Sequence, residues 1–109
     1  MSSDVVFQTT DYKEVPVKLF RRQLEHVLLK RPWLIQYLNE VKSTVEEPDF
    51  VLKGKHGEYL SVKYFEHILG GKHLIVVYKV IESGGFIITI FPMERVDKLI
   101  RKRVRIWSL

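Results

Sequence analysis

The spacing of apolar residues predicts helices in the first half of the chain and strands in the second half. After Pro16, apolar residues recur every three or four positions as far as Lys30, which is typical of an amphipathic helix. Pro32 ends this pattern because a proline disfavours helical geometry in the residue before it, here Arg31. The same spacing then returns and predicts a second helix that extends to about Glu47.

Beyond Pro48 the pattern changes to short runs rich in β-branched and aromatic residues. Runs of this kind predict strands, and the glycine-containing segments between them predict tight turns. Residues 95–103 form a basic segment in which we expect a last helix. Residues 1–14 show no clear period, and their apolar run fits either a short strand or a segment tucked under the core. The predicted strands are residues 50–53, 58–65, 74–81 and 86–91.

The order of these elements predicts the fold class. Helices that come first, followed by short strands joined by hairpin-sized turns, argue for an α+β fold. We expect the N-terminal helices to pack on one face of an antiparallel sheet of about four strands, with a basic C-terminal segment after it. A chain of 109 residues is long enough for one core and too short for two, so a single domain over residues 1–109 is expected.

Two polar residues interrupt the most apolar runs of the chain. Lys79 lies within residues 74–81 and Thr89 within residues 86–91. Burial of a lysine is costly unless its ammonium group reaches water or an anion, so we expect an open sheet face at Lys79. A three-residue turn over residues 83–85 would place Lys79 directly opposite Thr89 and would keep the other face apolar. We expect this register.

The charge of the chain favours a polyanionic partner. Eighteen lysine and arginine residues outnumber thirteen aspartate and glutamate residues, which gives a formal net charge of +5. The positive excess gathers after residue 94, whereas an acidic segment occupies residues 40–49. A charge run of this length is also compatible with an ordinary solvated tail.

The amino-acid composition also excludes several kinds of catalytic and metal-binding site. The chain has no cysteine, which excludes a disulfide framework, a thiolate metal site and a cysteine nucleophile. Its four histidines lack the short spacing of a metal-binding pair, so we expect no metal site. No apolar stretch reaches the roughly 20 residues that a membrane-spanning helix needs, and the N-terminus lacks the pattern of a signal peptide. We expect a cytoplasmic protein without a membrane partner.

Four short segments, taken in order, resemble a family of nucleases. They are HVLLKRP from His26, PD from Pro48, VVYKV from Val76 and GFIIT from Gly85. In this order and spacing, over about residues 20–92, the chain resembles the phage- and toxin-associated branch of the barnase / EndoU / colicin / RelE-like group, the BECR fold. The resemblance implies a helical histidine and basic residues in front of a four-stranded antiparallel sheet, whose inner strands carry a lysine and a serine or threonine.

The resemblance further implies a toxin-like endoribonuclease that needs neither a metal nor a cofactor. In this reaction the ribose 2′-hydroxyl attacks the adjacent phosphorus, and cleavage leaves a 2′,3′-cyclic phosphate. His26 would transfer the proton, and Arg31 and Lys79 would hold the phosphate and stabilise its developing charge. Thr89 would donate a hydrogen bond to a phosphate oxygen.

Two other functions fit the same sequence. The first is a non-catalytic RNA-binding module, in which the basic segment follows the phosphates and an open sheet face accepts bases. The second is a protein-interaction domain of the toxin–antitoxin type, because the alternating tail at residues 103–107 can add to a sheet or dock on an acidic antitoxin or immunity-like protein. The residues expected to contact RNA are Tyr64, Arg95, Lys98, Arg101, Lys102 and Arg103.

Overall fold

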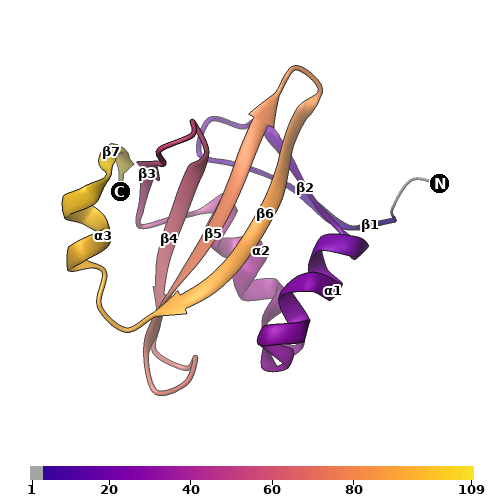
Figure 1. The fold of residues 1–109 in the computed structure, drawn as a ribbon, viewed down its shortest axis with the longest axis horizontal. Coiled ribbons are helices and arrows are strands. Elements are labelled where there is room, and N and C mark those ends of the chain that lie inside the picture. Colours follow the sequence, from indigo (N-terminus) through magenta and orange to yellow (C-terminus); the bar gives the residue numbers. More distant parts are fainter. Residues whose placement is uncertain (1–3) are drawn as a thin grey trace.

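Residues 4–109, the part of the chain that the computed structural model describes, form seven strands, three α-helices and one 3-10 helix. In chain order the elements are β1 (Val5–Thr10), β2 (Pro16–Phe20), α1 (Arg21–Lys30), the 3-10 helix η1 (Pro32–Tyr37), α2 (Leu38–Glu46), β3 (Phe50–Lys53), β4 (Tyr59–Phe65), β5 (Lys72–Ile81), β6 (Gly84–Met93), α3 (Asp97–Lys102) and β7 (Val104–Ser108). The strands make one sheet in the order β1-β2-β6-β5-β4-β3-β7 (Figure 1).

The chain is an α+β domain, but the prediction of an antiparallel sheet of about four strands behind N-terminal helices is wrong. β1 and β2 precede the first helix, and β7 pairs with β3 at the far edge of the sheet. β2 runs parallel to β6 through the pairs Val17–Gly85 and Lys18–Phe86, so the sheet is mixed. The predicted strands are present as β3 to β6, and they form the antiparallel centre of the sheet.

The first helix begins later than predicted because residues 16–20 form β2. Val17 and Leu19 are completely buried, whereas Lys18 and Phe20 are half-buried. This alternation is that of a strand with one face in the core. Phe20 has an extended backbone, and α1 starts at the next residue without a connecting loop.

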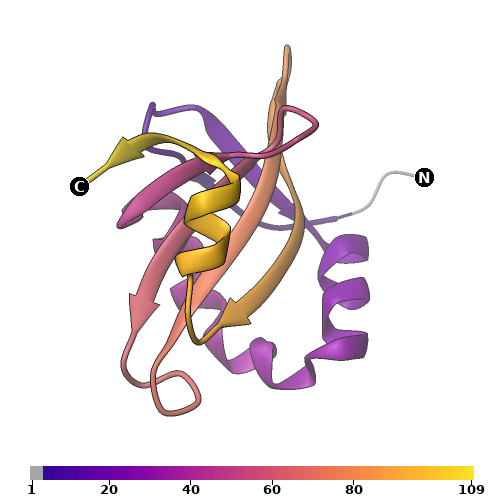
Figure 2. The same ribbon diagram turned by 60° about the vertical axis from the view of Figure 1, so that its left-hand side comes forward.

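The helical segments α1, η1 and α2 lie on one side of the sheet (Figure 2), and the larger apolar core fills the space between them and the strands. Two polar groups within this layer are satisfied, as buried polar groups must be. The Ser61 hydroxyl donates to the carbonyl of Thr44 over 2.7 Å, and the Tyr78 hydroxyl donates to the Asp11 carboxylate over 2.8 Å. The fully buried members of the core include Val17, Leu19, Leu34, Val41, Val45, Ile68, Leu74, Val76, Tyr78 and Ile90.

A smaller core lies on the opposite face, beneath α3. Val96, Leu99 and Ile100 bring apolar side chains from α3 and its first turn onto this face. Because α3 has only six residues, it covers part of the sheet and leaves the side chains of β6 half-buried. The strand residues buried beneath it are Leu52, Leu60, Val62, Ile75 and Val77.

The turn between β5 and β6 is shorter than the predicted three-residue turn. Ile81 pairs with Gly84, so only Glu82 and Ser83 lie between the strands. Gly84 has a φ of +121°, which glycine adopts without the steric cost of a Cβ atom. A Cβ on the neighbouring Gly85 would stand 2.9 Å from a side-chain carbon of β2. The two glycines therefore allow the hairpin and β2 to meet at this point.

The predicted pairing of Lys79 with Thr89 is wrong, although both residues share a face. Lys79 lies opposite Phe86, and Thr89 lies opposite Val77. A shift of register between these two pairs leaves Ile88 without a direct partner, as in a β-bulge. With a two-residue turn and no bulge, Thr89 would lie on the opposite face from Lys79. The bulge places Thr89 on the same face as Val77 and Lys79.

A contact between Tyr12 and Trp107 brings the two ends of the sheet together. Their ring centroids lie 5.6 Å apart, one in the turn after β1 and the other in β7. In the same turn, the Asp11 carboxylate accepts hydrogen bonds from two backbone N–H groups as well as from Tyr78. Burial, and then the neighbouring Asp11, raise the pKa of the Tyr78 phenol far above its ordinary value, so this hydroxyl stays protonated.

Candidate functional site

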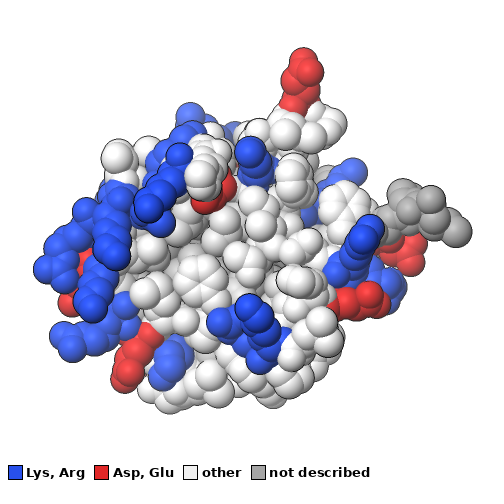
Figure 3. All heavy atoms as spheres, viewed as in Figure 1, with Lys and Arg blue, Asp and Glu red and all other residues white. Residues whose placement is uncertain are grey.

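The sheet face that carries α3 is only partly covered, and we call its uncovered part the open face. Figure 3 views the molecule from this side, where uncharged atoms occupy the centre and lysine and arginine gather over α3 and β7. Strand alternation with the two cores assigns each side chain to its face. The open face consists of Lys18, Phe20, Tyr64, His73, Lys79, Phe86, Ile88, Thr89, Phe91 and Met93.

Phe86 lies between two lysines at one end of the open face. Lys18 of β2 pairs with it on one side, and Lys79 of β5 pairs with it on the other. Side chains of directly paired residues point to the same face, with Cβ atoms about 5 Å apart. Within residues 4–109, neither lysine ammonium has an ion pair or a hydrogen-bond partner. Two uncompensated positive charges therefore flank one half-buried aromatic ring.

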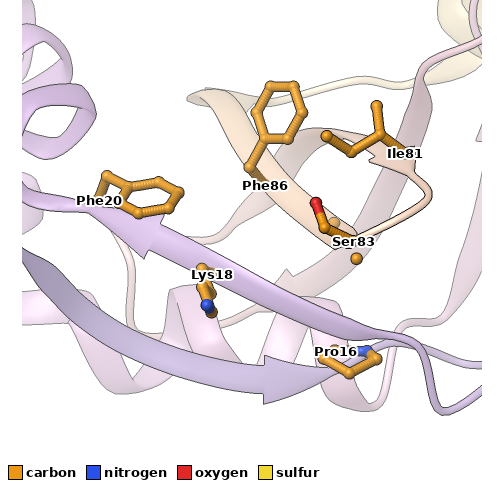
Figure 4. A pocket seen from close by; sticks show the side chains of 8 residues that line it. Pro16, Lys18, Phe20, Ile81, Ser83 and Phe86 are labelled. Atoms are coloured by element: carbon orange, nitrogen blue, oxygen red, sulfur yellow. The ribbon is translucent and has the colours of Figure 1, made fainter. Parts of the chain in front are cut away.

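A hollow of about 190 Å³ opens beside Phe86, where β2 meets the β5–β6 hairpin; we call it the hairpin hollow. Figure 4 shows Lys18 and Phe20 on β2, Phe86 and Ile81 on the hairpin, and Ser83 at the turn. Its polar side-chain groups are the Lys18 ammonium and the Ser83 hydroxyl, and none of the residues that line it is acidic. The hairpin hollow is therefore mainly apolar and carries one positive charge.

A second hollow, of about 450 Å³, lies at the other end of β6, and we call it the basic hollow. It is lined by Met93, Arg95, Asp97, Lys98 and Arg101. The guanidinium of Arg95 is 4.0 Å from the Asp97 carboxylate, and both side chains are exposed, so water screens this ion pair. Lys98 and Arg101 lie one turn apart on α3 and have no acidic partner within residues 4–109.

A row of three side chains joins the basic hollow to the sheet. Tyr64 pairs with His73 across β4 and β5, and His73 pairs with Met93 across β5 and β6. The Tyr64 and His73 rings meet edge-on with centroids 5.1 Å apart, and Tyr64 is 44% exposed. β6 itself runs from Phe86 at one hollow to Met93 at the other, roughly 20 Å at the rise of a strand.

The four residues predicted for catalysis come from two layers of the molecule. His26 is exposed on α1, and Arg31 is the residue at which α1 ends. Lys79 and Thr89 belong to the open face. Within residues 4–109, no hydrogen bond or ion pair joins any two of these side chains, and none of them lines either hollow. Their catalytic roles stay predictions.

Of the six residues predicted to contact RNA, three lie together, because Arg95, Lys98 and Arg101 line the basic hollow. Tyr64 is on the open face, two strands from Met93 of that hollow, with His73 between them. Lys102 is exposed on α3 but does not line the hollow.

Arg103 does not line the basic hollow and lies instead near the β3–β4 turn. It is half-buried, and its Nη1 donates to the carbonyl of Lys102 over 3.3 Å. The pKa of the Glu58 carboxyl is lowered first by backbone hydrogen bonds within the turn and, to a smaller extent, by the positive charge of Arg103. We therefore leave Arg103 out of the candidate site.

Sequence reasoning missed Lys18, Phe20 and Phe86 as parts of one site. The helix predicted over residues 16–30 hides the first two, because a helix would not place them beside β6. The signal that reveals them is the alternation of apolar and other residues along residues 17–20, which fits a strand with one buried face. These two residues lie near Phe86 because β2 pairs in parallel with β6, and no local sequence pattern predicts this pairing.

Comparisons with known proteins add no relative, since no family model, no curated protein and no solved structure matches this chain. The resemblance to the nuclease group therefore stays a prediction. In the described part of the chain, no group of three or more histidine, aspartate or glutamate side chains is placed to hold a metal ion. No helix among these residues is long and apolar enough to cross a membrane.

Proposed function

We propose that this domain binds single-stranded RNA on its open face. The observation that carries the proposal is Phe86, a half-buried aromatic side chain with an uncompensated lysine on each side. The basic hollow lies at the other end of the same strand. A single strand of nucleic acid presents the two matching features, a line of phosphates and a row of bases with open faces.

Cations at both ends of the open face supply contacts for phosphates. Lys18 and Lys79 stand at one end, and Lys98 and Arg101 stand at the other. With the two ends roughly 20 Å apart, a strand that touches both passes over the intervening side chains of β6. Release of counterions from the bound phosphates then favours binding, and added salt weakens it.

Aromatic side chains between these cations favour a single strand over a duplex. Phe86, Phe91 and Tyr64 expose ring surface on a sheet that faces solvent. Proteins stack such rings on bases that have left the helix, whereas the bases of a duplex are stacked on one another. We therefore expect a duplex of the same length to bind more weakly.

Charge reversal at the basic hollow tests the proposal. Wild-type protein should bind a short fluorescently labelled single-stranded RNA, measured by anisotropy at several salt concentrations. The double variant Lys98→Glu/Arg101→Glu should bind on the order of 10-fold or more weakly, because two phosphate contacts become repulsive. The matched control is Lys13→Glu/Lys55→Glu, which makes the same change of charge in two exposed turns that line neither hollow. Equal losses in both variants, or no binding by the wild type, would contradict the proposal.

Endoribonuclease activity stays a prediction of the family resemblance. A cleavage assay with the same labelled RNA tests it. Labelled RNA incubated with the protein and a chelator should be recovered intact if the domain only binds. Cleavage to 2′,3′-cyclic phosphate ends that His26→Ala abolishes would instead support the catalytic alternative. An acidic antitoxin or immunity-like partner also stays a prediction. β7, which could receive such a partner, is bound to β3 along one edge and ends the sheet along the other.

A further inference from the structure

We propose that the hairpin hollow holds one unstacked nucleotide of the bound strand, with its base against Phe86 and Phe20 and its phosphate at Lys18. This inference rests on the proposed RNA binding and adds to it a distinct subsite. The basic hollow at the other end of β6 would then hold the phosphate backbone, and the hairpin hollow would hold a base.

The first argument is the apolar lining. Phe20 and Phe86 come from neighbouring strands, and Ile81 closes the hollow from β5 (Figure 4). Two rings and an aliphatic side chain present a surface that water solvates poorly and that the face of a base can cover. The polar side chains among the lining residues, Ser83 with its hydroxyl and Lys18 with its ammonium, fit the sugar and phosphate that accompany a base.

The second argument is the charge around the ring. Lys18 lines the hollow, and Lys79 is paired with Phe86 from the other side. Glu82, the acidic residue of the turn, does not line the hollow. A ligand that carries a negative charge beside a flat apolar group is complementary to this arrangement. A purely apolar peptide side chain would leave the Lys18 charge without a partner.

The third argument is the rigid floor of the hollow. Gly84 and Gly85 line it with backbone, and a Cβ on either would lie 3.3 Å from the carbonyl oxygen of Pro16. Gly84 also holds a positive φ. The backbones of β2 and the hairpin are thus in close contact, and a subsite built on paired strands keeps its shape without a ligand.

A cycle that combines a base deletion with a ring substitution tests the subsite. The RNA probes are a short single-stranded oligonucleotide and a series in which one base at a time is replaced by an abasic residue. The protein variants are Phe86→Leu, which keeps apolar bulk but removes the ring, and Phe65→Leu as the matched control. Phe65 is also a half-buried phenylalanine of a strand, but it packs on the helix-covered face and lines neither hollow.

For the wild type, one abasic position should weaken binding on the order of 10-fold, the scale of a lost base–aromatic stack. In Phe86→Leu that position should matter no more than its neighbours, and in Phe65→Leu it should matter as in the wild type. If the abasic penalty is the same in all three proteins, the subsite is wrong while RNA binding stands. If the wild type binds none of the probes, the proposed function fails, and the subsite fails with it.

Amide chemical shifts keep the test decisive if Phe86→Leu does not fold. On addition of the intact oligonucleotide to wild-type protein, the amide signals of Lys18 and of residues 83–86 should shift together with those of α3. Shifts confined to α3 and the end of β6 would reject a nucleotide in the hairpin hollow.

Discussion

The same strands form both faces of the sheet, but helices cover the two faces to different extents. On the helix side, three helical segments leave Leu34, Val41 and Ile90 with no exposed surface. On the other side, one helix of six residues covers part of the sheet and leaves Phe86 and Phe91 half-buried. A fully covered face tolerates a polar group only with a partner, as Tyr78 has in Asp11, whereas a partly covered face can hold uncompensated lysines.

The comparison shows that the pleat of single strands separates the buried core positions from the positions of the proposed RNA-binding face. Along β5, Tyr78 points into the closed core and Lys79 points to the open face. Along β6, Ile87 and Ile88 divide in the same way. Neighbouring positions are therefore expected to respond very differently to substitution.

The largest expected effect separates two adjacent isoleucines. Ile87→Ala, on the closed face where Ile87 is 2% exposed, should lower the free energy of unfolding by about 2–5 kcal/mol, because it leaves a cavity in a packed core. Ile88→Ala, on the half-open face, should lower it by about 1 kcal/mol, because the site can fill with solvent or relax. Urea denaturation of both variants measures the difference. Equal losses would show that the two faces are equally packed.

The next largest effect is a pH dependence of the free energy of unfolding, which Tyr78 on the helix-covered face causes. The Tyr78 pKa is raised above the ordinary value of 10.0, so the folded state keeps the phenol neutral where the unfolded state ionises. Its stabilising contribution is complete below about pH 10 and falls as pH rises further, by about 1.4 kcal/mol per pH unit.

Tyr78→Phe should remove the contribution of Tyr78 to the slope of unfolding free energy against pH. The variant also loses the hydrogen bond to Asp11, so its stability at neutral pH should be lower. Free energies of unfolding from urea titrations on both sides of pH 10 give the two slopes. Parallel slopes for the variant and the wild type would mean that Tyr78 ionises in the folded state. The pKa of Tyr12, which burial also raises, is common to both proteins and cancels from the difference.

The smallest expected effect distinguishes the two ends of the open face. Arg101→Ala should reduce the slope of log affinity against log salt by about 1, because one phosphate contact is lost. Phe86→Leu should lower the affinity for single-stranded RNA and leave that slope unchanged, because a stacked base releases no counterion. A change of slope in Phe86→Leu would place a phosphate, not a base, at the ring.

The local spacing of apolar residues was sufficient to predict the central elements of the fold. The runs that became β3 to β6 and the spacing that became α2 predict their elements because each has a long or strongly periodic apolar stretch. The short β2 was misassigned because Phe20, Leu24 and Val27 also satisfy helical spacing, and five residues of alternation compete poorly with it. Its true state is decided by pairing with β6, a tertiary contact.

The site was predictable only in part, for a related reason. The basic residues of α3 cluster in sequence, so Arg95, Lys98 and Arg101 could be named before the fold was known. The pairing of Lys79 with Phe86 depends on the length of one turn, and the pairing of Thr89 with Val77 depends also on the bulge at Ile88. His26 and Lys79 were brought together by analogy, and neither residue lines a hollow.

The contact between Tyr12 and Trp107 has a consequence for how the chain folds. It joins a turn near the start of the sequence to a strand near its end, so it forms only after almost the whole chain has been drawn into a closed loop. Local hairpins such as β5–β6 pay a much smaller entropic penalty and should assemble earlier. A ribosome-bound chain still lacking β7 would therefore present its β1–β2 turn without the indole that later covers it.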